Sequence, residues 1–256
     1  MEISHIQPEG WGLCPVIPLG PVPVSTYAVF MLLAFVAGIA VYRRNAARMG
    51  ARTGQVFPVV LAAVFGGVFG AKIPVWALTV ALVPPSEWRL EHLLVGRTIA
   101  GGFVGGMLAV WWVKRRLGLR ARFGNVLAPA VALGMAVGRV GCLLSGCCHG
   151  RPTALPWGLD FGDGVPRHPT QVYEILFCLS AFLFMQRRPE TVRPGALMTG
   201  FLAAYFVFRF AEEFLRPRDI AWGLTVFQWI CLAGLLLLVL RERLFRAPPG
   251  GENAAP

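Results

Sequence analysis

Seven long apolar stretches dominate this sequence, and all but the fifth, which is the shortest, are long enough to cross the hydrocarbon core of a bilayer. About 20 consecutive apolar residues span the roughly 30 Å of a membrane core as a helix. Charged residues make up only 14% of the chain, against about 25% in soluble domains. The stretches cover residues 24–42, 55–83, 95–113, 123–145, 171–186, 195–215 and 222–240. The sequence therefore predicts an all-α integral membrane protein with seven transmembrane helices.

Lys and Arg residues are distributed unevenly among the connections between these stretches. Fifteen lie in the odd-numbered connections and after the last stretch. Six lie in the even-numbered connections or, in the case of Arg97, at the outer start of the third stretch, and three lie deep inside stretches. Because cytoplasmic loops carry the excess of positive charge, this bias predicts an N-terminus outside and a C-terminus inside. The net charge of +11 then reflects topology, and we expect no binding to nucleic acid.

The expected domain boundaries follow from this topology. Residues 1–22 form an external N-terminal tail, residues 23–241 a seven-helix catalytic domain, and residues 242–256 a cytoplasmic tail. The longest connection, residues 146–170, is external and rich in Gly and Pro. The first 22 residues contain no Lys or Arg, so they lack the basic start of a cleavable signal peptide.

Polar residues inside the stretches mark the candidate site, because ionisable groups are costly in a membrane and point to function by default. The helical rise places nearly all of them in the outer half: Tyr27, Lys72, Arg139, Glu174, Tyr205, Arg209 and Glu213. Glu213 follows Arg209 by four residues and can pair with it or with Arg216. Guanidinium groups bind phosphate oxygens with paired donors. Two arginines in one leaflet therefore predict a pocket for an anionic lipid headgroup.

Simpler structural roles stay open for several of these residues. Tyr27 can be an interfacial anchor, and the amine of Lys72 can extend to the interface. The pairing of Arg209 with Glu213 can serve only to fix the rotation of a helix. The glycine pairs 101–102 and 105–106 repeat with a spacing of four, which favours close helix packing over a smooth wall beside a lipid groove.

Three of the six cysteines lie in the segment CLLSGCCHG, which covers residues 142–150. Cys142, Cys147, Cys148 and His149, with His168, have ligand types that suit zinc. However, three of them are adjacent and lack the usual C-x₂₋₄-C spacing, so we expect no metal. The alternatives are a disulfide from Cys142 to Cys147 or Cys148, a reactive thiol that takes part in transfer, and small residues that pack under the loop.

Several motifs resemble those of the prolipoprotein diacylglyceryl transferase family. They are GRVG at 138–141, GR at 150–151, HPTQVYE at 168–174, and Tyr205 with RF and EF at 209–214. The GP that precedes Tyr27 and the glycine run at 101–106 are supporting matches. The resemblance covers residues from about 20 to 240, and its specific parts are HPTQVYE and the two GR motifs.

The resemblance implies a multi-pass enzyme of the bacterial inner membrane with its active site toward the outer leaflet. Such an enzyme transfers diacylglyceryl from phosphatidylglycerol to the lipobox cysteine of prolipoproteins, forms a thioether and releases glycerol 1-phosphate. Its partners would be phosphatidylglycerol, prolipoprotein signal peptides and membrane lipid, with no cofactor, and it would act as a monomer. The implied catalytic residues are Arg139, Arg209, Tyr27 and His168. The implied substrate-binding residues are Arg139, Arg209, Tyr205, Gly150, Arg151, Glu213, Glu174 and Cys142.

The chain departs from the family pattern at two positions near the expected site. Ala100 stands where the family usually has a histidine proposed to deprotonate the incoming thiol, and Cys142 stands where it usually has asparagine. A thiol near two arginines can lose its proton without a dedicated base, or His149 or His168 can substitute. Two other functions stay open. One is a non-catalytic or altered-acceptor lipid-binding paralogue, and the other, less favoured, is an anion or small-solute transporter.

Overall fold

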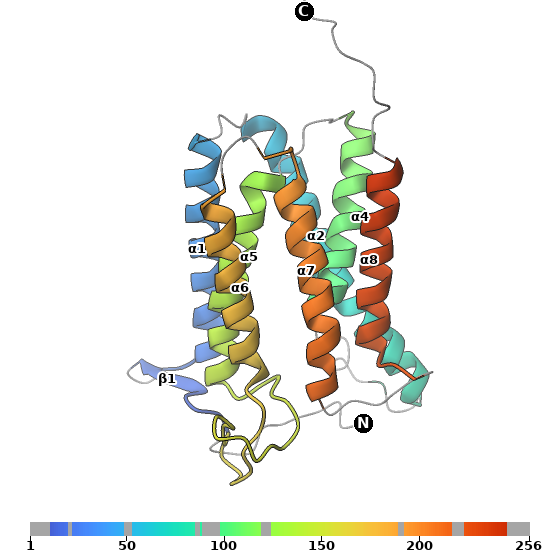
Figure 1. The fold of residues 1–256 in the computed structure, drawn as a ribbon. Coiled ribbons are helices and arrows are strands. Elements are labelled where there is room, and N and C mark those ends of the chain that lie inside the picture. The colour runs from blue at the N-terminus through green and yellow to red at the C-terminus, as the bar shows by residue number, and fades with distance from the viewer. Residues whose placement is uncertain are drawn as a thin grey trace, which may run out of the picture.

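The computed structural model describes residues 11–19, 22–48, 53–84, 88, 98–118, 124–188, 192–216 and 223–244. Within these ranges, α-helices run alternately up and down and form a bundle (Figure 1). The seven helices are α1 Thr26–Arg48, α2 Thr53–Leu82, α4 Ile99–Arg116, α5 Gly124–Leu144, α6 Thr170–Gln186, α7 Ala196–Glu212 and α8 Val226–Leu244. A short 3₁₀ helix, η2 Glu213–Leu215, continues α7. Each predicted apolar stretch overlaps one of these helices.

The surface of the bundle suits lipid. Among the described residues, α1, residues Phe57–Ala77 of α2, and α5 are long and apolar enough to cross a membrane, and α6 and Val226–Arg241 of α8 are shorter apolar helices. Large apolar side chains cover the outside of α1 and α2, and more than half the surface of each of the following is exposed: Leu32, Phe35, Val36, Ile39, Phe57, Phe65 and Phe69. Exposed apolar patches of this size mark contact with membrane or a partner. The prediction of an α-helical membrane protein is confirmed at this level.

Two short strands precede α1, and the sequence did not predict them. β1 Val16–Leu19 pairs antiparallel with β2 Val22–Ser25. Both strands contain proline, which argues against a strand in the interior of a sheet. Proline is tolerated here because both strands of a two-stranded hairpin are edge strands. The expected boundary at residue 22 therefore falls inside a hairpin. Of the other expected tail, residues 242–244 end α8, and residues 245–256 lie outside the described residues.

Glycines let two pairs of helices approach at backbone distance. A Cβ atom at Gly70 of α2 would lie 2.5 Å from the carbonyl oxygen of Gly101 in α4, and one at Gly66 would lie 2.6 Å from that of Gly105. The glycine face of α4 is thus covered by α2, which supports helix packing over a lipid groove. Similarly, a Cβ atom at Gly141 of α5 would lie 2.7 Å from the Cβ of Phe30 in α1.

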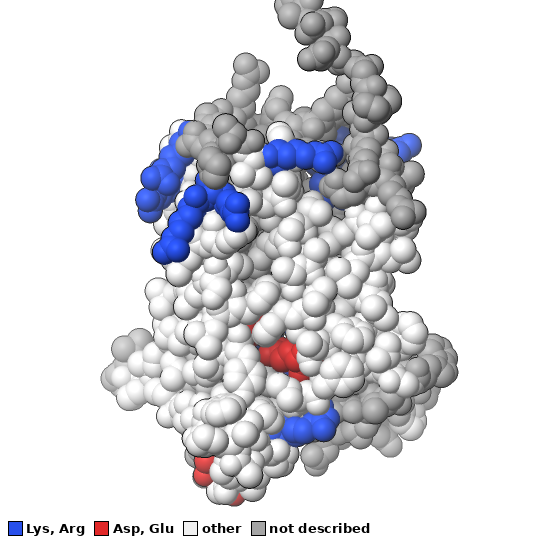
Figure 2. Space-filling view, in the orientation of Figure 1, with Lys and Arg blue, Asp and Glu red and all other residues white. Residues whose placement is uncertain are grey.

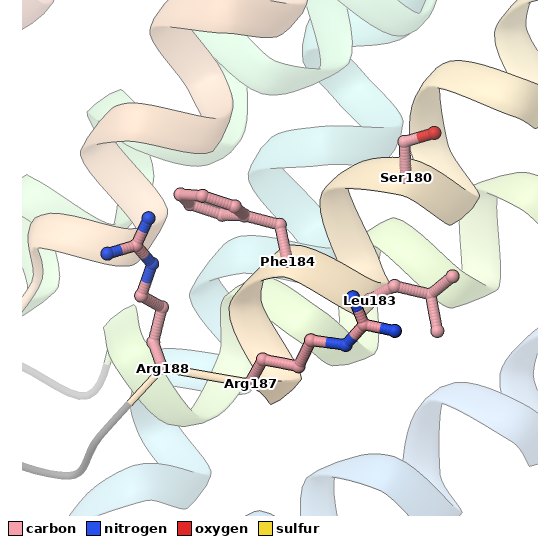
Figure 3. Close-up of a pocket in the computed structure, with 5 residues that line it drawn as sticks. All are labelled: Ser180, Leu183, Phe184, Arg187 and Arg188. Carbon is pink, nitrogen blue, oxygen red and sulfur yellow. The ribbon is translucent and has the colours of Figure 1, made fainter.

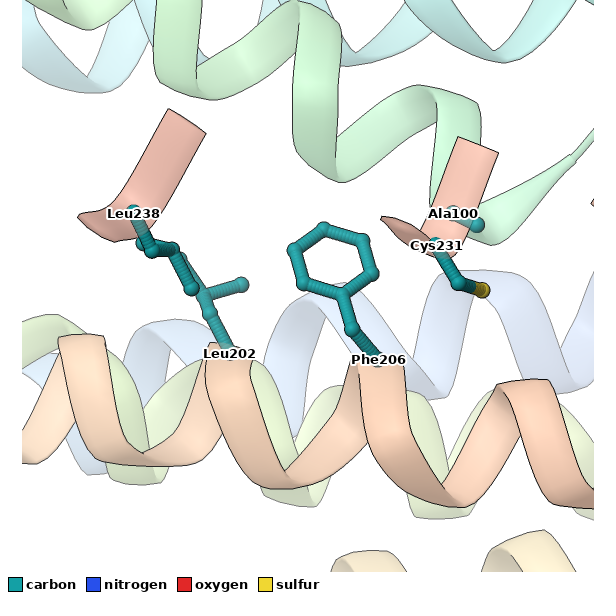
Figure 4. Packing of buried hydrophobic residues seen from close by; sticks show 5 residues of the cluster. All are labelled: Ala100, Leu202, Phe206, Cys231 and Leu238. Carbon is teal, nitrogen blue, oxygen red and sulfur yellow. The ribbon is translucent and has the colours of Figure 1, made fainter. Parts of the chain in front are cut away.

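Apolar side chains fill the space between α4, α7 and α8. Figure 4 shows five members of this cluster, in which the ring of Phe206 lies among the other four: Ala100, Leu202, Phe206, Cys231 and Leu238. Beside it, the ring of Phe103 packs edge-on against that of Tyr205, with centroids 4.9 Å apart. This packing fixes the face of α7 that carries Tyr205 and Arg209.

Basic side chains gather at one end of the bundle, where α6 ends and α7 begins (upper end in Figure 2). Those at the last turns of α1 and α4 and just after α6 are Arg48, Lys114, Arg115, Arg116, Arg187 and Arg188. Acidic atoms appear only in the lower half of the face that Figure 2 shows. Basic atoms also appear at the lower end of this face (Figure 2), so the upper end carries the larger share of the described basic side chains but not all of them.

Candidate functional site

Arg139 lies in the last turns of α5 and forms an ion pair with Glu174 in the second turn of α6. Its Nη2 atom is 2.6 Å from Oε2 of Glu174. The other carboxylate oxygen of Glu174 accepts a hydrogen bond of 2.9 Å from the hydroxyl of Tyr205 in α7. Arg139 is 6% exposed, and Glu174 and Tyr205 are fully buried. One carboxylate therefore ties together the three helices that carry the predicted site.

Arg209 of α7 is the centre of a second ion-pair network. Its Nη1 atom is 2.8 Å from Glu212, and its Nη2 atom is 2.7 Å from Glu213. The pairing with Glu213 is the one that the four-residue spacing predicts. Glu212 also lies 3.4 Å from Nη2 of Arg216. Thr225, just before α8, donates a hydrogen bond of 3.3 Å to Glu213, so the network extends to the fourth helix of the site.

The two networks form one charged centre. Arg139 and Arg209 both lie close enough to Glu174 and Tyr205 to interact with them electrostatically. The six charged side chains comprise three guanidinium groups and three carboxylates. The centre is therefore balanced in charge, whereas the sequence had suggested a basic pocket. Buried charges are stable only when they are paired in this way.

Two buried N–H donors of this centre keep their hydrogen-bonding capacity. Within the described part of the chain, the Nε atoms of Arg139 and Arg216 have no hydrogen-bond partner. A buried unsatisfied donor costs about 1–3 kcal/mol. An unsatisfied guanidinium N–H is a donor that an acceptor oxygen would satisfy.

The loop after α5 closes one end of the site. The backbone N–H of Gly150 donates to the carbonyl of His168 over 2.8 Å, and that of Arg151 donates to the carbonyl of Leu215 over 2.7 Å. A Cβ atom at residue 150 would lie 2.7 Å from both the Cβ of His168 and the carbonyl oxygen of Leu215. Only glycine permits this approach, so Gly150 joins the loop to the start of α6 and the end of α7.

The other predicted residues lie on the loop before α6, on α1 and on α2. His168 Nδ1 is 3.2 Å from the hydroxyl of Tyr173, and the Arg151 side chain is exposed. Tyr27 is half-buried in the first turn of α1, and its Cα would be 3.4 Å from a Cβ atom at Gly141. Lys72 is half-buried on α2, which packs mainly against α4.

Three thiols lie beside Arg139. The Sγ atoms of Cys142, Cys147 and Cys148 are all within 4.8 Å of one another, and Nη1 of Arg139 is 3.7 Å from Sγ of Cys142. All six cysteines of the chain are free thiols in this structure. Hydrogen bonds from the other two thiols, followed by the positive charges of Arg139 and Arg216, lower the pKa of the Cys148 thiol and outweigh the effect of burial.

Several residues of the site were not among those predicted, although Arg216 was considered as a partner of Glu213. Glu212 and Arg216 complete the second ion-pair network. The side chains of Thr170 and Gln171, both fully buried, donate hydrogen bonds of 2.6 Å to the carbonyls of Cys148 and Cys147. Thr170 and Gln171 both belong to the HPTQVYE motif, and their positions in this motif are the sequence signal that could have identified them.

A separate pocket lies at the opposite end of α6 from Glu174. It has a volume of about 510 Å³ and is lined by Ser180, Leu183, Phe184, Arg187 and Arg188 (Figure 3). The guanidinium group of Arg188 lies 4.0 Å from the ring centroid of Phe184. Long basic side chains at helix ends commonly cover apolar surface in this way at a membrane interface. None of these five residues belongs to the charged centre.

Comparison with known proteins agrees with the motifs at this site. A phosphatidylglycerol–prolipoprotein diacylglyceryl transferase of Nitratidesulfovibrio vulgaris (strain DP4) is 33% identical over 93% of this chain and 94% of its own length. Proteins of the same name from Geobacter sulfurreducens and Cupriavidus necator are 32% and 30% identical, over 88% and 94% of this chain and 87% and 95% of theirs. The family profile described as prolipoprotein diacylglyceryl transferase matches residues 15–241. The chain belongs to this family.

Proposed function

We propose that this protein transfers diacylglyceryl from phosphatidylglycerol to the cysteine thiol of a prolipoprotein. The thiol sulfur attacks C3 of the glycerol backbone, a thioether forms, and glycerol 1-phosphate leaves. The names of the relatives, which match over nearly their whole length, support this reaction. The observation that carries the proposal is the charged centre in which Glu174 joins Arg139 to Tyr205.

Arg139, Arg209 and Arg216 form the headgroup site in this proposal. The Nε–H groups of Arg139 and Arg216 donate to phosphate oxygens, while the carboxylates hold the guanidinium groups in place. Negative charge grows on the phosphate as the C3–O bond breaks, and donors fixed before the reaction stabilise that charge best. The unpartnered donors also give a reason for selectivity toward a phosphodiester headgroup. Such a headgroup carries one negative charge and has oxygens that can accept hydrogen bonds from both Nε–H groups.

The remaining predicted residues shape the substrate path. Tyr27 lines the site beside α5, and Gly150 and Arg151 hold the loop against α7. His168 lies at the rim, where it meets the signal peptide. Cys142 contacts Arg139 at the position where family members usually have asparagine.

The topology in this proposal has seven spans, an external N-terminus, an internal C-terminus and a location in the bacterial inner membrane. The basic residues in the last turn of α4 and just after α6 support it, because they lie at the end of the bundle away from Glu174. The charged centre then lies in the outer half of the membrane. In this proposal the protein acts as a monomer.

Complementation of a strain depleted of its own transferase tests this function. Wild-type protein restores growth, whereas Arg139→Ala and Arg209→Ala do not, because loss of one such oriented donor slows catalysis by about 100-fold or more. Arg187→Ala, an exposed arginine remote from the centre, is the matched control and restores growth. Full transfer activity of the Arg139→Ala protein in reconstituted membranes with phosphatidylglycerol would contradict the headgroup assignment.

A further inference from the structure

The proposed reaction needs the acceptor thiol to lose its proton. Alanine at position 100, where the family usually has a histidine base, cannot accept that proton. Ala100 is 2% exposed and packs against Phe206 and Cys231 in an apolar cluster. Three thiols of the chain lie beside Arg139 instead, with their Sγ atoms within 4.8 Å of one another. No step of the reaction described above uses them as a group.

The local backbone explains how two adjacent cysteines bring their thiols together with a third. Cys142 lies in the last turn of α5, and its carbonyl accepts a hydrogen bond of 3.1 Å from the backbone N–H of Cys147. Gly146 and Cys148 both have positive φ angles, +69° and +64°. Left-handed residues reverse the chain, and non-glycine residues rarely adopt this conformation. The turn therefore removes the objection that adjacent cysteines lack metal-binding spacing.

Hydrogen bonds from the first turn of α6 fix this turn. The side chains of Gln171 and Thr170 donate hydrogen bonds of 2.6 Å to the carbonyls of Cys147 and Cys148. Both donor residues are fully buried in the first turn of α6. A ligand set that is held by buried hydrogen bonds is preorganised for binding, and this support is a general requirement of metal sites.

We propose that Cys142, Cys147 and Cys148 bind one Zn²⁺ ion as thiolates and leave its fourth position open for the acceptor thiol. Zinc–sulfur bonds are about 2.3 Å long, so three sulfurs around one ion lie up to about 4 Å apart. Thiolates select soft ions such as Zn²⁺ and Cu⁺ over Mg²⁺ or Ca²⁺. Three thiolates and one Zn²⁺ carry a single negative charge, and the guanidinium group of Arg139 lies close to it, with Nη1 3.7 Å from Cys142 Sγ.

His149 is not the fourth ligand. Its ring stacks on that of Phe161, with centroids 5.5 Å apart, and also packs against Trp11. Its Nδ1 atom is 3.0 Å from the carbonyl oxygen of Gly150. Zinc sites with three protein ligands and one open position are the catalytic type, whereas closed four-ligand sites are structural.

This inference rests on the proposed function and supplies its missing step. The acceptor thiol takes the fourth position and releases its proton to water, because a thiol bound to zinc is deprotonated at neutral pH. The zinc-bound sulfur then attacks C3 of the glycerol, the carbon–sulfur bond forms, and the C3–O bond breaks. Its electron pair leaves with glycerol 1-phosphate, which Arg139 holds beside the metal. No oxidant or reductant is needed.

Metal analysis of the full-length protein, purified with its thiols reduced, tests the site. We expect one zinc per chain, and loss of most of it in Cys142→Ser, Cys147→Ser and Cys148→Ser. Cys14→Ser is the matched control, since Cys14 is exposed and outside the cluster. Cobalt substituted for zinc in the wild-type protein should give thiolate-to-metal absorption that changes when a lipobox peptide is added, but not when its Cys→Ser analogue is added. Absence of zinc and cobalt binding by folded wild-type protein overturns the inference.

Transfer assays separate this inference from the function on which it rests. Chelation of zinc from wild-type protein should lower transfer by about 30-fold at pH 7, because a free thiol with a pKa near 8.5 is only about 3% thiolate there. Added Zn²⁺ should restore the rate. Unchanged transfer by the zinc-free protein overturns the catalytic site but leaves the transferase function standing. One bound zinc with a peptide-dependent cobalt spectrum, but no transfer, supports the site and contradicts the function.

Discussion

Glu174 makes the closest contact with Arg139 and is itself fully buried. Removal of one partner of a buried pair leaves an uncompensated charge and costs about 3–5 kcal/mol. Tyr205 would lose its acceptor at the same time, since its hydroxyl donates to the other carboxylate oxygen. Glu174 therefore stabilises the positions of both Arg139 and Tyr205 in the site.

Glu174→Gln keeps the volume of this side chain but removes its charge, and it should lower the thermal stability of the purified protein. Phosphatidylglycerol should then stabilise the variant more than it stabilises the wild type, because a phosphate replaces the missing negative charge beside Arg139. Thermal unfolding in detergent with and without the lipid measures both effects. Asp163→Asn, which removes an exposed carboxylate in the loop, is the control. An equal lipid effect on both proteins would show that the phosphate does not reach Arg139.

Gly150→Ala should reduce transfer about tenfold or more, because the added Cβ would meet His168 and the carbonyl of Leu215 at 2.7 Å. Overpacking of this kind costs about 1–3 kcal/mol and would move the loop away from α7. Gly200→Ala is the control, since no atom lies within 4 Å of a Cβ there, and alanine is the better helix former. Transfer rates and unfolding temperatures of the two variants, measured together, test this role of Gly150.

The sequence could identify the arginines because a charge inside an apolar stretch stands out. It could also predict that Glu213 pairs with Arg209, since the two are four residues apart on one helix. It could not show that Glu212 pairs with Arg209 and Arg216 as well, because that depends on the rotation of α7 and the 3₁₀ turn that follows. The same limit applies to the three thiols, whose approach requires a left-handed residue at position 148.

At the scale of elements, α2 and α4 depend on glycine more than any other pair. Gly105→Ala should lower the stability of the bundle by about 1–3 kcal/mol, because the added Cβ would lie 2.6 Å from the Cα of Gly70. Gly67→Ala is a matched control on the facing helix, where the nearest atom lies 3.7 Å away. Thermal unfolding of both variants in detergent checks this. Equal unfolding temperatures would show that the two helices can move apart freely.

The helices themselves could be predicted from length and apolar content, because the backbone of a chain in lipid must satisfy its own hydrogen bonds. The hairpin before α1 could not, since four-residue strands that contain proline have no detectable alternation. The loop 146–170 also stayed undetermined, because its shape depends on contacts with distant parts of the chain. Arg167, for example, lies over the ring of Trp11 at 5.4 Å.

At the scale of the whole molecule, the charge difference between the two ends predicts how the chain lies in the membrane. Cys14 precedes α1 and is exposed, so a membrane-impermeant maleimide should modify it in intact spheroplasts. A cysteine introduced by Arg115→Cys, at the exposed end of α4, should react only after the membrane is permeabilised. Mass spectrometry of the labelled peptides distinguishes the two sites. The opposite pattern would reverse the proposed orientation and place the charged centre in the inner leaflet.

The first described residues bind to a part of the chain that is synthesised much later. The backbone N–H groups of Gly12 and Cys14 donate to the carbonyls of Phe161 and Leu144, over 2.6 and 2.8 Å, and the Trp11 indole donates to Gly146. During translation, this segment therefore cannot form these hydrogen bonds until more than half of the protein has left the ribosome. Completion of the cysteine-containing turn is thus a late event in biogenesis, and a bulky tag fused at the N-terminus would interfere with maturation before it affected catalysis.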